Sequence, residues 1–492
     1  MINESFDLNI IKWYSFVNIN SVLLIGKNEE IYSELSKKFK KILAIEDINE
    51  LKTEDKEQTF DYIVIYGMEN LKLNITDLDE LIDEKSKILI IGDNYTGINN
   101  WSKYSTNNTE ELLMLKKNKL DVNSSLVKIK SILEKKKYNF NEFFVFPNYK
   151  NTELIIESNF VANKSQIERY NPMFCENEIK IFDEIDALDL IIQTKPEMME
   201  FFTNSYFIEA SKGKIEEKIK LVTFNNCRKE KYRLITIIQD NVVEKIPANI
   251  KAKSHIQNMI SIIKDLKNTE LDILDYEDND HIYSKFIKDY KTLDIILYEK
   301  RENFNDIENI LNNLKQLLLP YSKENEDGLH ILKKAYWDMI PKNCFYIDGK
   351  FIFFDQEWQK ENLSIEFIIY RSIINSYDLV KEINVDKLLE KMKLIQYKEQ
   401  FEKIDAELRN EIIDEKIYNE MYNKNIKTID NIINDNKIVN KQIEDIKQDN
   451  LNKQEYIKNL ERINKELEDK VKEDSRKLVK LNKIEKIMFW RK

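Results

Sequence analysis

Short apolar runs alternate with an amphipathic segment over the first hundred residues. The runs are SVLLIG (21–26), ILAIED (42–47), FDYIVIYG (60–67) and KILIIG (87–92). Continuous apolar runs of this length are typical of parallel strands that are buried on both faces. The segment EEIYSELSKKFKK between the first two runs repeats its apolar residues at helical spacing. The pattern predicts an open α/β sheet with right-handed crossovers, whose ligands would lie beyond the carboxyl ends of the strands.

The pattern changes after residue 200. The segments KIKLVTFNN, YRLITIIQDN and VVEKIPA predict three consecutive strands. A helix is expected from about Ala252 to Lys267, with Ile256, Ile260 and Ile263 on one face. Lys245 lies near the end of the third strand, directly before this helix.

The last part of the chain, from Ile426, has a heptad repeat and contains neither Gly nor Pro. The first seam set, at the a positions, is Ile429, Asn436, Ile443, Asn450, Ile457, Asn464, Val471 and Leu478. The second seam set, at the d positions, is Ile432, Val439, Ile446, Lys453, Leu460, Leu467, Asp474 and Leu481. Sustained heptads predict a coiled coil, and Asn at alternate a positions favours a parallel dimer. A single amphipathic helix that folds back on the protein is the alternative.

Composition limits the classes of function. The 492 residues include 7 Gly and 6 Pro, so a loop that cradles phosphates must work with little glycine. The formal net charge of −11 disfavours nucleic acid as a partner. Cys175, Cys227 and Cys344 are too far apart for a zinc knuckle or a disulfide framework. The acidic first residues and the lack of an apolar run near 20 residues predict a cytoplasmic protein without a transmembrane segment.

The order of elements in the first module resembles a class I S-adenosylmethionine-dependent methyltransferase, which implies a Rossmann-like α/β domain. The family has a glycine-rich loop after the first strand and an acidic residue after the second. At these positions the chain keeps Gly26 and Asp47, the residual S-adenosylmethionine-site positions. Glu29 and Glu30 stand where the carboxylate of the cofactor would lie, and like charge opposes its binding. We therefore expect a degenerate site that does not bind S-adenosylmethionine.

Further segments extend this resemblance along the chain. FDYIVIYGMENL, DNYTGINNW, FVFPNYKNTELIIES, RYNPMFCENEIKIFDE and FFTNSYFIE follow in this order from residue 60 to residue 209. Together they resemble a bacterial family of two-module proteins with a methyltransferase-like N-terminal half. The resemblance covers most of residues 20–380 and implies a role in surface or flagellar glycan biosynthesis, with other glycan-synthesis proteins as possible partners.

The stretch AYWDMIPKNCFYIDGKFIFFDQEW (335–358) contains the most specific candidate chemistry. The Asp348-Gly349 step between apolar runs predicts a type I′ hairpin. This hairpin would join a loop that carries Asp338 and Asn343 to a strand that ends before Asp355. The arrangement resembles the catalytic and metal loops of the α+β protein-kinase fold, in the aminoglycoside-phosphotransferase and choline-kinase branch.

The resemblance to kinases implies a role for each residue. Asp338 would be the catalytic base, Lys245 would contact the ATP phosphates, and Asn343 and Asp355 would hold Mg²⁺, with Glu357 as a further possible metal contact. The sequence departs from the kinase pattern, because Tyr336 replaces a histidine and Gln356-Glu357 replaces Phe-Gly. The presumed phosphate loop NNCRKEKY contains no glycine.

These observations predict four regions in the chain. They are a methyltransferase-like domain (1–155), a connecting segment (156–199), a kinase-like domain (200–425) and a coiled coil (426–492). The first hypothesis is a small-molecule phosphotransferase that uses ATP and Mg²⁺ and dimerises through its tail. The alternatives are a methyltransferase of glycan synthesis and a non-catalytic scaffold built on two pseudoenzyme domains.

Overall fold

The computed structural model describes residues 6–71, 73–102, 125–160, 180–216, 218–278, 280–288, 290–421 and 427–489. Cys175 and most of the segment RYNPMFCENEIKIFDE lie outside these ranges. The chain divides into two compact units. We call Met1–Glu178 together with Asp183–Ile426 the globular unit, and Ile179–Phe182 together with Lys427–Lys492 the helical unit.

A 12-stranded sheet runs through the globular unit, in the order β12-β13-β10-β9-β8-β6-β5-β7-β4-β3-β1-β2. Its strands are β1 (Ser21–Ile25), β2 (Lys41–Ile45), β3 (Tyr62–Tyr66), β4 (Lys87–Asp93), β5 (Asn139–Phe146), β6 (Leu154–Glu157), β7 (Ser205–Ser211), β8 (Ile219–Phe224), β9 (Leu234–Gln239), β10 (Val242–Pro247), β12 (Tyr276–Asp278) and β13 (Ile282–Lys285). Strands β1 to β4 pair in parallel, as the apolar runs predict. The remaining pairs are antiparallel. The fold is therefore mixed α/β around one large sheet.

Strand β7 shows that the two predicted modules share this sheet. It follows residue 200 in the sequence but lies between β4 and β5, and it pairs with both. Strand β8 in turn pairs with β6. A boundary at residue 200 therefore separates β7 from its neighbours in the sheet. The pairing depends on contacts between distant segments, which the local apolar pattern does not encode.

Two of the helices that accompany the sheet in the globular unit, α2 and α7, have a polar side chain that caps their first turn. Asn28 accepts hydrogen bonds from the backbone amides of Glu30 and Ile31 at the start of α2, and Asp183 caps α7 in the same way. The helices are α1 (Asn9–Lys12), α2 (Glu29–Lys38), α3 (Thr53–Lys56), α4 (Ile98–Ser102), α5 (Leu126–Lys135), α7 (Glu184–Thr194), α8 (Met199–Phe202), α9 (Lys253–Lys267), α10 (Leu293–Glu299), α11 (Phe304–Leu318), α12 (Ile365–Ile374), α13 (Tyr377–Glu382), α14 (Val385–Lys391), α15 (Lys398–Ile412) and α16 (Glu415–Met421). Helix α9 buries Ile256, Ile260 and Ile263, which confirms its predicted apolar face.

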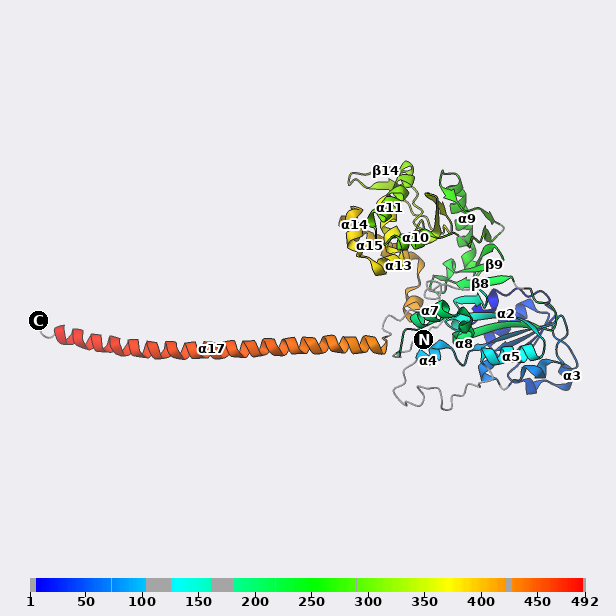
Figure 1. Ribbon diagram of the computed structural model, residues 1–492, viewed down its shortest axis with the longest axis horizontal. Helices are drawn as coiled ribbons and strands as arrows, with labels where there is room; N and C mark the ends of the chain where they lie inside the picture. The colour runs from blue at the N-terminus through cyan, green and yellow to red at the C-terminus, as the bar shows by residue number, and fades with distance from the viewer. Residues whose placement is uncertain are drawn as a thin grey trace. The chain divides into compact units, whose positions relative to one another are not determined.

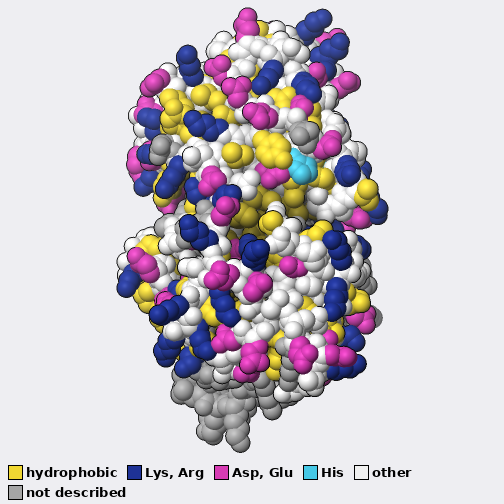
Figure 2. All heavy atoms as spheres, turned by 90° about the vertical axis from the view of Figure 1, so that its right-hand side faces the viewer, with side chains coloured by type: hydrophobic (Ala, Val, Ile, Leu, Met, Phe, Trp, Pro, Cys, Tyr) yellow, Lys and Arg dark blue, Asp and Glu magenta, His cyan; other side chains and the backbone are white. Residues whose placement is uncertain are grey.

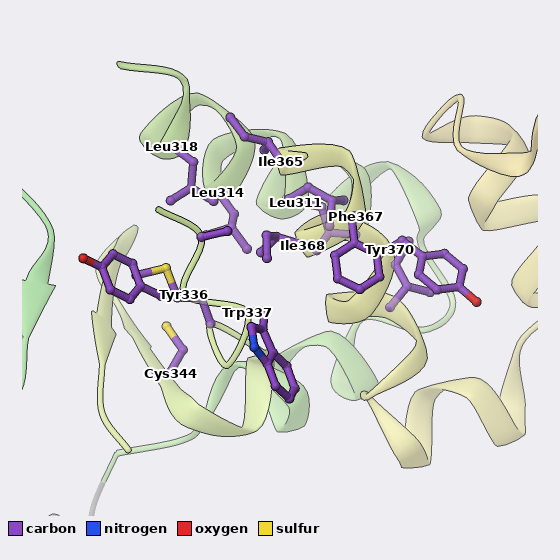
Figure 3. Close-up of a cluster of buried hydrophobic side chains, with 14 of the residues drawn as sticks. Leu311, Leu314, Leu318, Tyr336, Trp337, Cys344, Ile365, Phe367, Ile368 and Tyr370 are labelled. Atoms are coloured by element: carbon purple, nitrogen blue, oxygen red, sulfur yellow. The ribbon is translucent and has the colours of Figure 1, made fainter. Parts of the chain in front are cut away.

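A hydrophobic core of the globular unit lies behind the predicted catalytic loop. Helices α11 and α12 contribute Leu311, Leu314 and Phe367 to it, and the loop contributes Tyr336 and Trp337 (Figure 3). Two small sheets flank this core: β11 (Asp272–Ile273), β17 (Lys350–Phe353) and β16 (Cys344–Ile347), and β14 (Ser322–Glu324), β15 (His330–Leu332) and β18 (Leu363–Ser364). The residues directly before Asp338 are thus anchored in a packed interior.

The helical unit consists mainly of α17 (Ile429–Phe489), a single helix of 61 residues that Figure 1 shows without a break. Its first turn is joined to Lys180, whose carbonyl accepts a hydrogen bond of 2.9 Å from the backbone amide of Ile429. Within the described ranges, no helix is long and apolar enough to cross a membrane.

Candidate functional site

The β16–β17 hairpin brings two of the predicted site residues to adjacent backbone segments. Asp348 and Gly349 both have positive φ, 49° and 81°, as a type I′ turn requires. The strand therefore returns beside the 3-10 turn Pro341–Asn343, and the backbone amide of Phe354 donates a hydrogen bond of 2.9 Å to the carbonyl of Asn343. This bond holds the segment that carries Asp355 against the segment that carries Asn343.

Asp338 connects the catalytic loop to the same place. Its carbonyl oxygen accepts hydrogen bonds from Asn343 Nδ2 at 3.1 Å and from Gln356 Nε2 at 3.2 Å. Its carboxylate lies 3.4 Å from the backbone nitrogen of Glu357. The structure therefore gathers Asp338, Asn343 and the segment from Asp355 to Glu357 in one site.

Lys245 reaches this site from β10. Its ammonium group forms an ion pair with Asp355, and it lies 2.9 Å from Glu357 Oε1. The backbone of Asp355 has a φ of 56°, which lies in the left-handed region that residues other than glycine seldom adopt. Such backbone strain is concentrated at functional sites. The predicted lysine and the predicted metal-binding carboxylate are thus in direct contact.

Glu357 is the most buried acid of the site and binds three basic groups. Besides Lys245, its carboxylate contacts Arg228 Nη1 at 2.5 Å and lies 3.5 Å from His255 Nε2. Trp358 stacks on the His255 ring, with 4.5 Å between the centroids. Sequence reasoning did not single out Arg228, although it lies in the presumed phosphate loop, and placed no role on His255. Only their positions in the sequence pointed to the site. Arg228 lies in the presumed phosphate loop, and His255 lies on the helix that follows Lys245.

The charges of this cluster shift its acid–base equilibria. Burial, Glu357 and Asp355 raise the pKa of Asp338 to about 6. Burial also acts to raise the pKa of Glu357, but Arg228, Lys245 and His255 outweigh it and hold that pKa well below the ordinary value. Burial opposes the charged form of Lys245, yet the carboxylates of Asp355 and Glu357 raise the pKa of its amine. At neutral pH the site therefore holds a charged lysine and a carboxylate, Asp338, that can take up a proton.

The described side chains at this site would supply only a few of the ligands of a divalent cation. No three His, Cys, Asp or Glu side chains in the described ranges are arranged to hold a metal ion. The Asn343 side chain donates a hydrogen bond from its amide nitrogen to the Asp338 carbonyl, so the amide oxygen is the atom that would bind a cation, and the Asp355 side chain is one-third exposed. Mg²⁺ commonly takes one or two protein oxygens together with phosphate oxygens and water. Asn343 and Asp355 fit that mode of binding.

At the first predicted site, at the carboxyl ends of β1 and β2, a side chain of the protein caps the following helix. Gly26 has a φ of 83°, and a Cβ there would lie 2.1 Å from the carbonyl oxygen of Tyr66. The amides at the start of α2 are capped by Asn28, whose own amide donates a hydrogen bond of 2.9 Å to Asp7. Asp47 accepts a hydrogen bond from the backbone of Asn49 and is half-buried. Gly26 and Asp47 thus keep their positions at this edge, but the helix amides are already satisfied.

A buried polar cluster continues this edge of the sheet beyond β3 and β4. Glu69 accepts hydrogen bonds from the Tyr149 hydroxyl at 2.8 Å and from the backbone amide of Asp93 at 3.0 Å. Asp93 in turn accepts a hydrogen bond of 2.5 Å from Ser205. Burial and the carboxylates of Glu69 and Asp93 raise the pKa of Tyr149 far above its ordinary value. Sequence analysis missed this cluster, because its members come from four distant segments.

The surface that Figure 2 displays carries basic and acidic side chains intermixed, around a hollow with hydrophobic side chains on its floor. No basic patch of the kind that tracks a nucleic-acid backbone is visible on this face.

Comparisons with known proteins gave only remote similarities. No family model and no curated protein matches the sequence. Among solved structures, phosphoethanolamine N-methyltransferase 2 from Haemonchus contortus, bound to phosphomonomethylethanolamine and S-adenosylhomocysteine, is 15% identical with a TM-score of 0.25. That match covers 42% of this chain and 52% of the other, so the chain spans about half the length of that protein.

Two further structures are similar at the same level. The ADP-bound aminoglycoside phosphotransferase APH(2'')-Ib is 13% identical with a TM-score of 0.21, over 41% of this chain and 86% of the other. The protein PKMT2 from Rickettsia typhi is 10% identical with a TM-score of 0.21, over 76% of this chain and 85% of the other. Structures similar to this chain thus include an S-adenosylmethionine-dependent methyltransferase and an aminoglycoside phosphotransferase.

Proposed function

We propose that the globular unit is a kinase-like phosphotransferase that transfers the γ-phosphoryl group of ATP to a hydroxyl group of a small molecule. The observation that carries the proposal is the contact of Lys245 with Asp355 and Glu357, beside the loop of Asp338 and Asn343. These residues come from β10, the catalytic loop and the segment after β17. Phosphoryl transfer requires such positioning and charge neutralisation more than covalent chemistry by the protein.

In the proposed reaction the bond between the γ-phosphorus and its bridging oxygen to the β-phosphate breaks, and a bond from the phosphorus to the acceptor oxygen forms. The proton of the acceptor hydroxyl passes to the Asp338 carboxylate, and ADP is the leaving group. A pKa of about 6 suits Asp338 to this role near neutral pH. Lys245 would neutralise phosphate charge. Mg²⁺, held by Asn343 and Asp355, would supply further charge stabilisation when bound.

In protein kinases, an acidic residue on the helix that follows the phosphate-binding lysine holds this lysine in place. Glu357 would take that role here. Helix α9 contributes His255 instead, and His255 contacts the far side of the Glu357 carboxylate. Lys245 thus keeps a buried acidic partner if phosphate oxygens and a metal ion separate it from Asp355. Arg228 is a second cation at the same carboxylate and would offset the lack of glycine in the presumed phosphate loop.

We further propose that the methyltransferase-like part no longer binds S-adenosylmethionine and that the reaction serves surface or flagellar glycan biosynthesis. The first statement is supported by Asn28, which caps α2, and by Asp7, which adds a carboxylate beside it. The second is supported by the resemblance of the sequence to proteins of glycan gene clusters. A cytoplasmic location would fit this role.

Thermal-shift assays with two ligands test these proposals. ATP with Mg²⁺ at millimolar concentration should raise the melting temperature, because a ligand stabilises only a protein that binds it. S-adenosylmethionine should leave it unchanged. Lys245→Met should lose the ATP effect, whereas Lys251→Met, a matched change at an exposed lysine paired with Glu230, should keep it. Stabilisation by S-adenosylmethionine alone would support the methyltransferase alternative, and no effect of either ligand would support the scaffold.

A further inference from the structure

Helix α17 exposes a long apolar seam. From Val439 to Leu481, the hydrophobic residues of both seam sets are exposed in the described part of the helix. Soluble proteins seldom leave so long a row of large apolar side chains in water, even one that polar residues interrupt. Helices of this kind also depend on the packing of their apolar face for most of their stability. The seam therefore requires a partner.

We propose that this partner is α17 of a second copy of the chain, in a parallel, in-register, two-stranded coiled coil. The proposal does not depend on the proposed catalytic function. The proposal is based on how the seam residues of two copies match. They match better in the parallel, in-register pair than after a slip of one heptad or in an antiparallel pair.

The asparagines of the first seam set specify the register. Asn436, Asn450 and Asn464 occupy every second a position, and the positions between and after them are apolar. In an in-register parallel pair each Asn faces its own copy, and the two amides can hydrogen-bond to each other. After a slip of one heptad, six of the seven remaining a layers would place an Asn against Ile or Val. An amide buried without a partner is costly, so this slip is disfavoured.

The antiparallel arrangement has the same defect. With full overlap of residues 429–481, each residue of the first seam set faces one of the second. Asn450 would then face Leu460, and Asn464 would face Ile446. Two of the three amides would lose the partner that the parallel arrangement gives them.

The other seam residues also favour two parallel strands. The apolar residues of the first seam set are β-branched up to Val471, and Leu recurs in the second set from Leu460 onward, a combination that favours parallel dimers. None of the seven flanking g–e′ pairs between parallel chains, such as Asp449 with Gln454, joins like charges.

Two layers of the second seam set carry a cost in this arrangement, because Lys453 and Asp474 would each face its own copy. Both have a neighbour of opposite charge on the same helix. Lys453 Nζ lies 2.7 Å from Asp449, and Asp474 lies 3.8 Å from Lys477 Nζ. These pairs reduce the repulsion, and long lysine side chains can extend their charge out of a seam.

Light scattering on the full-length protein, combined with cysteine cross-linking, tests the proposal. The mass should be twice that of one chain. Ile443→Cys and Leu478→Cys should each form a disulfide-linked dimer under mild oxidation, because parallel in-register chains bring identical seam positions together. Gln448→Cys is the matched control, since it lies on the same helix but faces away from the seam and should not cross-link. The wild type, in which Cys227 and Cys344 are buried, shows the background.

Other results would overturn the proposal. A mass of one or three chains would exclude the two-stranded coiled coil. In an antiparallel dimer, the two copies of residue 443 lie about 36 Å apart, at 1.5 Å per residue. Cross-linking would then occur only in a mixture of Ile443→Cys with Leu467→Cys, and this outcome would exclude the parallel orientation.

Discussion

Glu357→Gln should destabilise the globular unit strongly, although it changes one functional group and little volume. The side chain is only 4% exposed and contacts Lys245 and Arg228 at 2.9 and 2.5 Å. Removing one partner of a buried ion pair costs about 3–5 kcal/mol, because the remaining charge is left without compensation. Lys245 keeps Asp355, so we expect a loss near the lower end, about 3 kcal/mol. With a urea slope of about 3 kcal/mol per molar, the unfolding midpoint should fall by roughly 1 M.

Urea titration followed by tryptophan fluorescence would measure this loss, since Trp358 lies beside the cluster. The matched control is Glu411→Gln, which removes an exposed pair with Lys360 and should cost less than about 1 kcal/mol. Because the folded pKa of Glu357 is depressed, its stabilising effect is present above its unfolded pKa of about 4.3 and disappears as the pH falls further. The difference in the free energy of unfolding between the wild type and Glu357→Gln should therefore be constant from pH 8 to about pH 5. It should shrink below about pH 4. A loss no larger than that of the control would refute the reasoning.

Two further predictions concern the catalytic base and the tail. Asp338→Asn should abolish phosphoryl transfer yet stabilise the fold at pH 7 by about 3 kcal/mol, since the wild-type pKa is raised to about 6 and the charged form is disfavoured. In urea titrations this gain should shrink as the pH falls through 6 and vanish below about 4; an equal gain at every pH would contradict the assignment. Removal of residues 426–492 should give a monomer by light scattering with an unchanged urea midpoint for the globular unit. A truncated dimer would show that the seam is not the interface.

The sequence predicts the local elements of this fold well and their long-range pairing poorly. Strands β1 to β4 are recognisable because a parallel strand buried on both faces leaves a continuous apolar run. The hairpin is recognisable because Asp348-Gly349 can adopt the two positive φ values that the turn needs. The insertion of β7 between β4 and β5 was not predicted, because no local pattern indicates which strand edges meet.

The candidate site shows the same division. Asp338, Asn343 and Asp355 could be proposed together because only a hairpin separates them in the sequence. Lys245 could be added only through the resemblance to kinases, and its ion pair with Asp355 spans 110 residues. Arg228 and His255 were not assigned to the site, because nothing in their local sequence shows that both contact Glu357. Arginine and histidine acquire such roles from the carboxylate that the fold places beside them.

Calorimetric titration of ATP into the full-length protein, with and without Mg²⁺, tests the central claim most directly. The account predicts binding to the wild type that strengthens with Mg²⁺. In Asp355→Asn the strengthening by Mg²⁺ should be lost, with the fold intact by circular dichroism. The matched variant Asp275→Asn, at an acid that is fully exposed, should behave as the wild type does. Absence of binding by the wild type at millimolar ATP and Mg²⁺ would contradict the account and favour a scaffold.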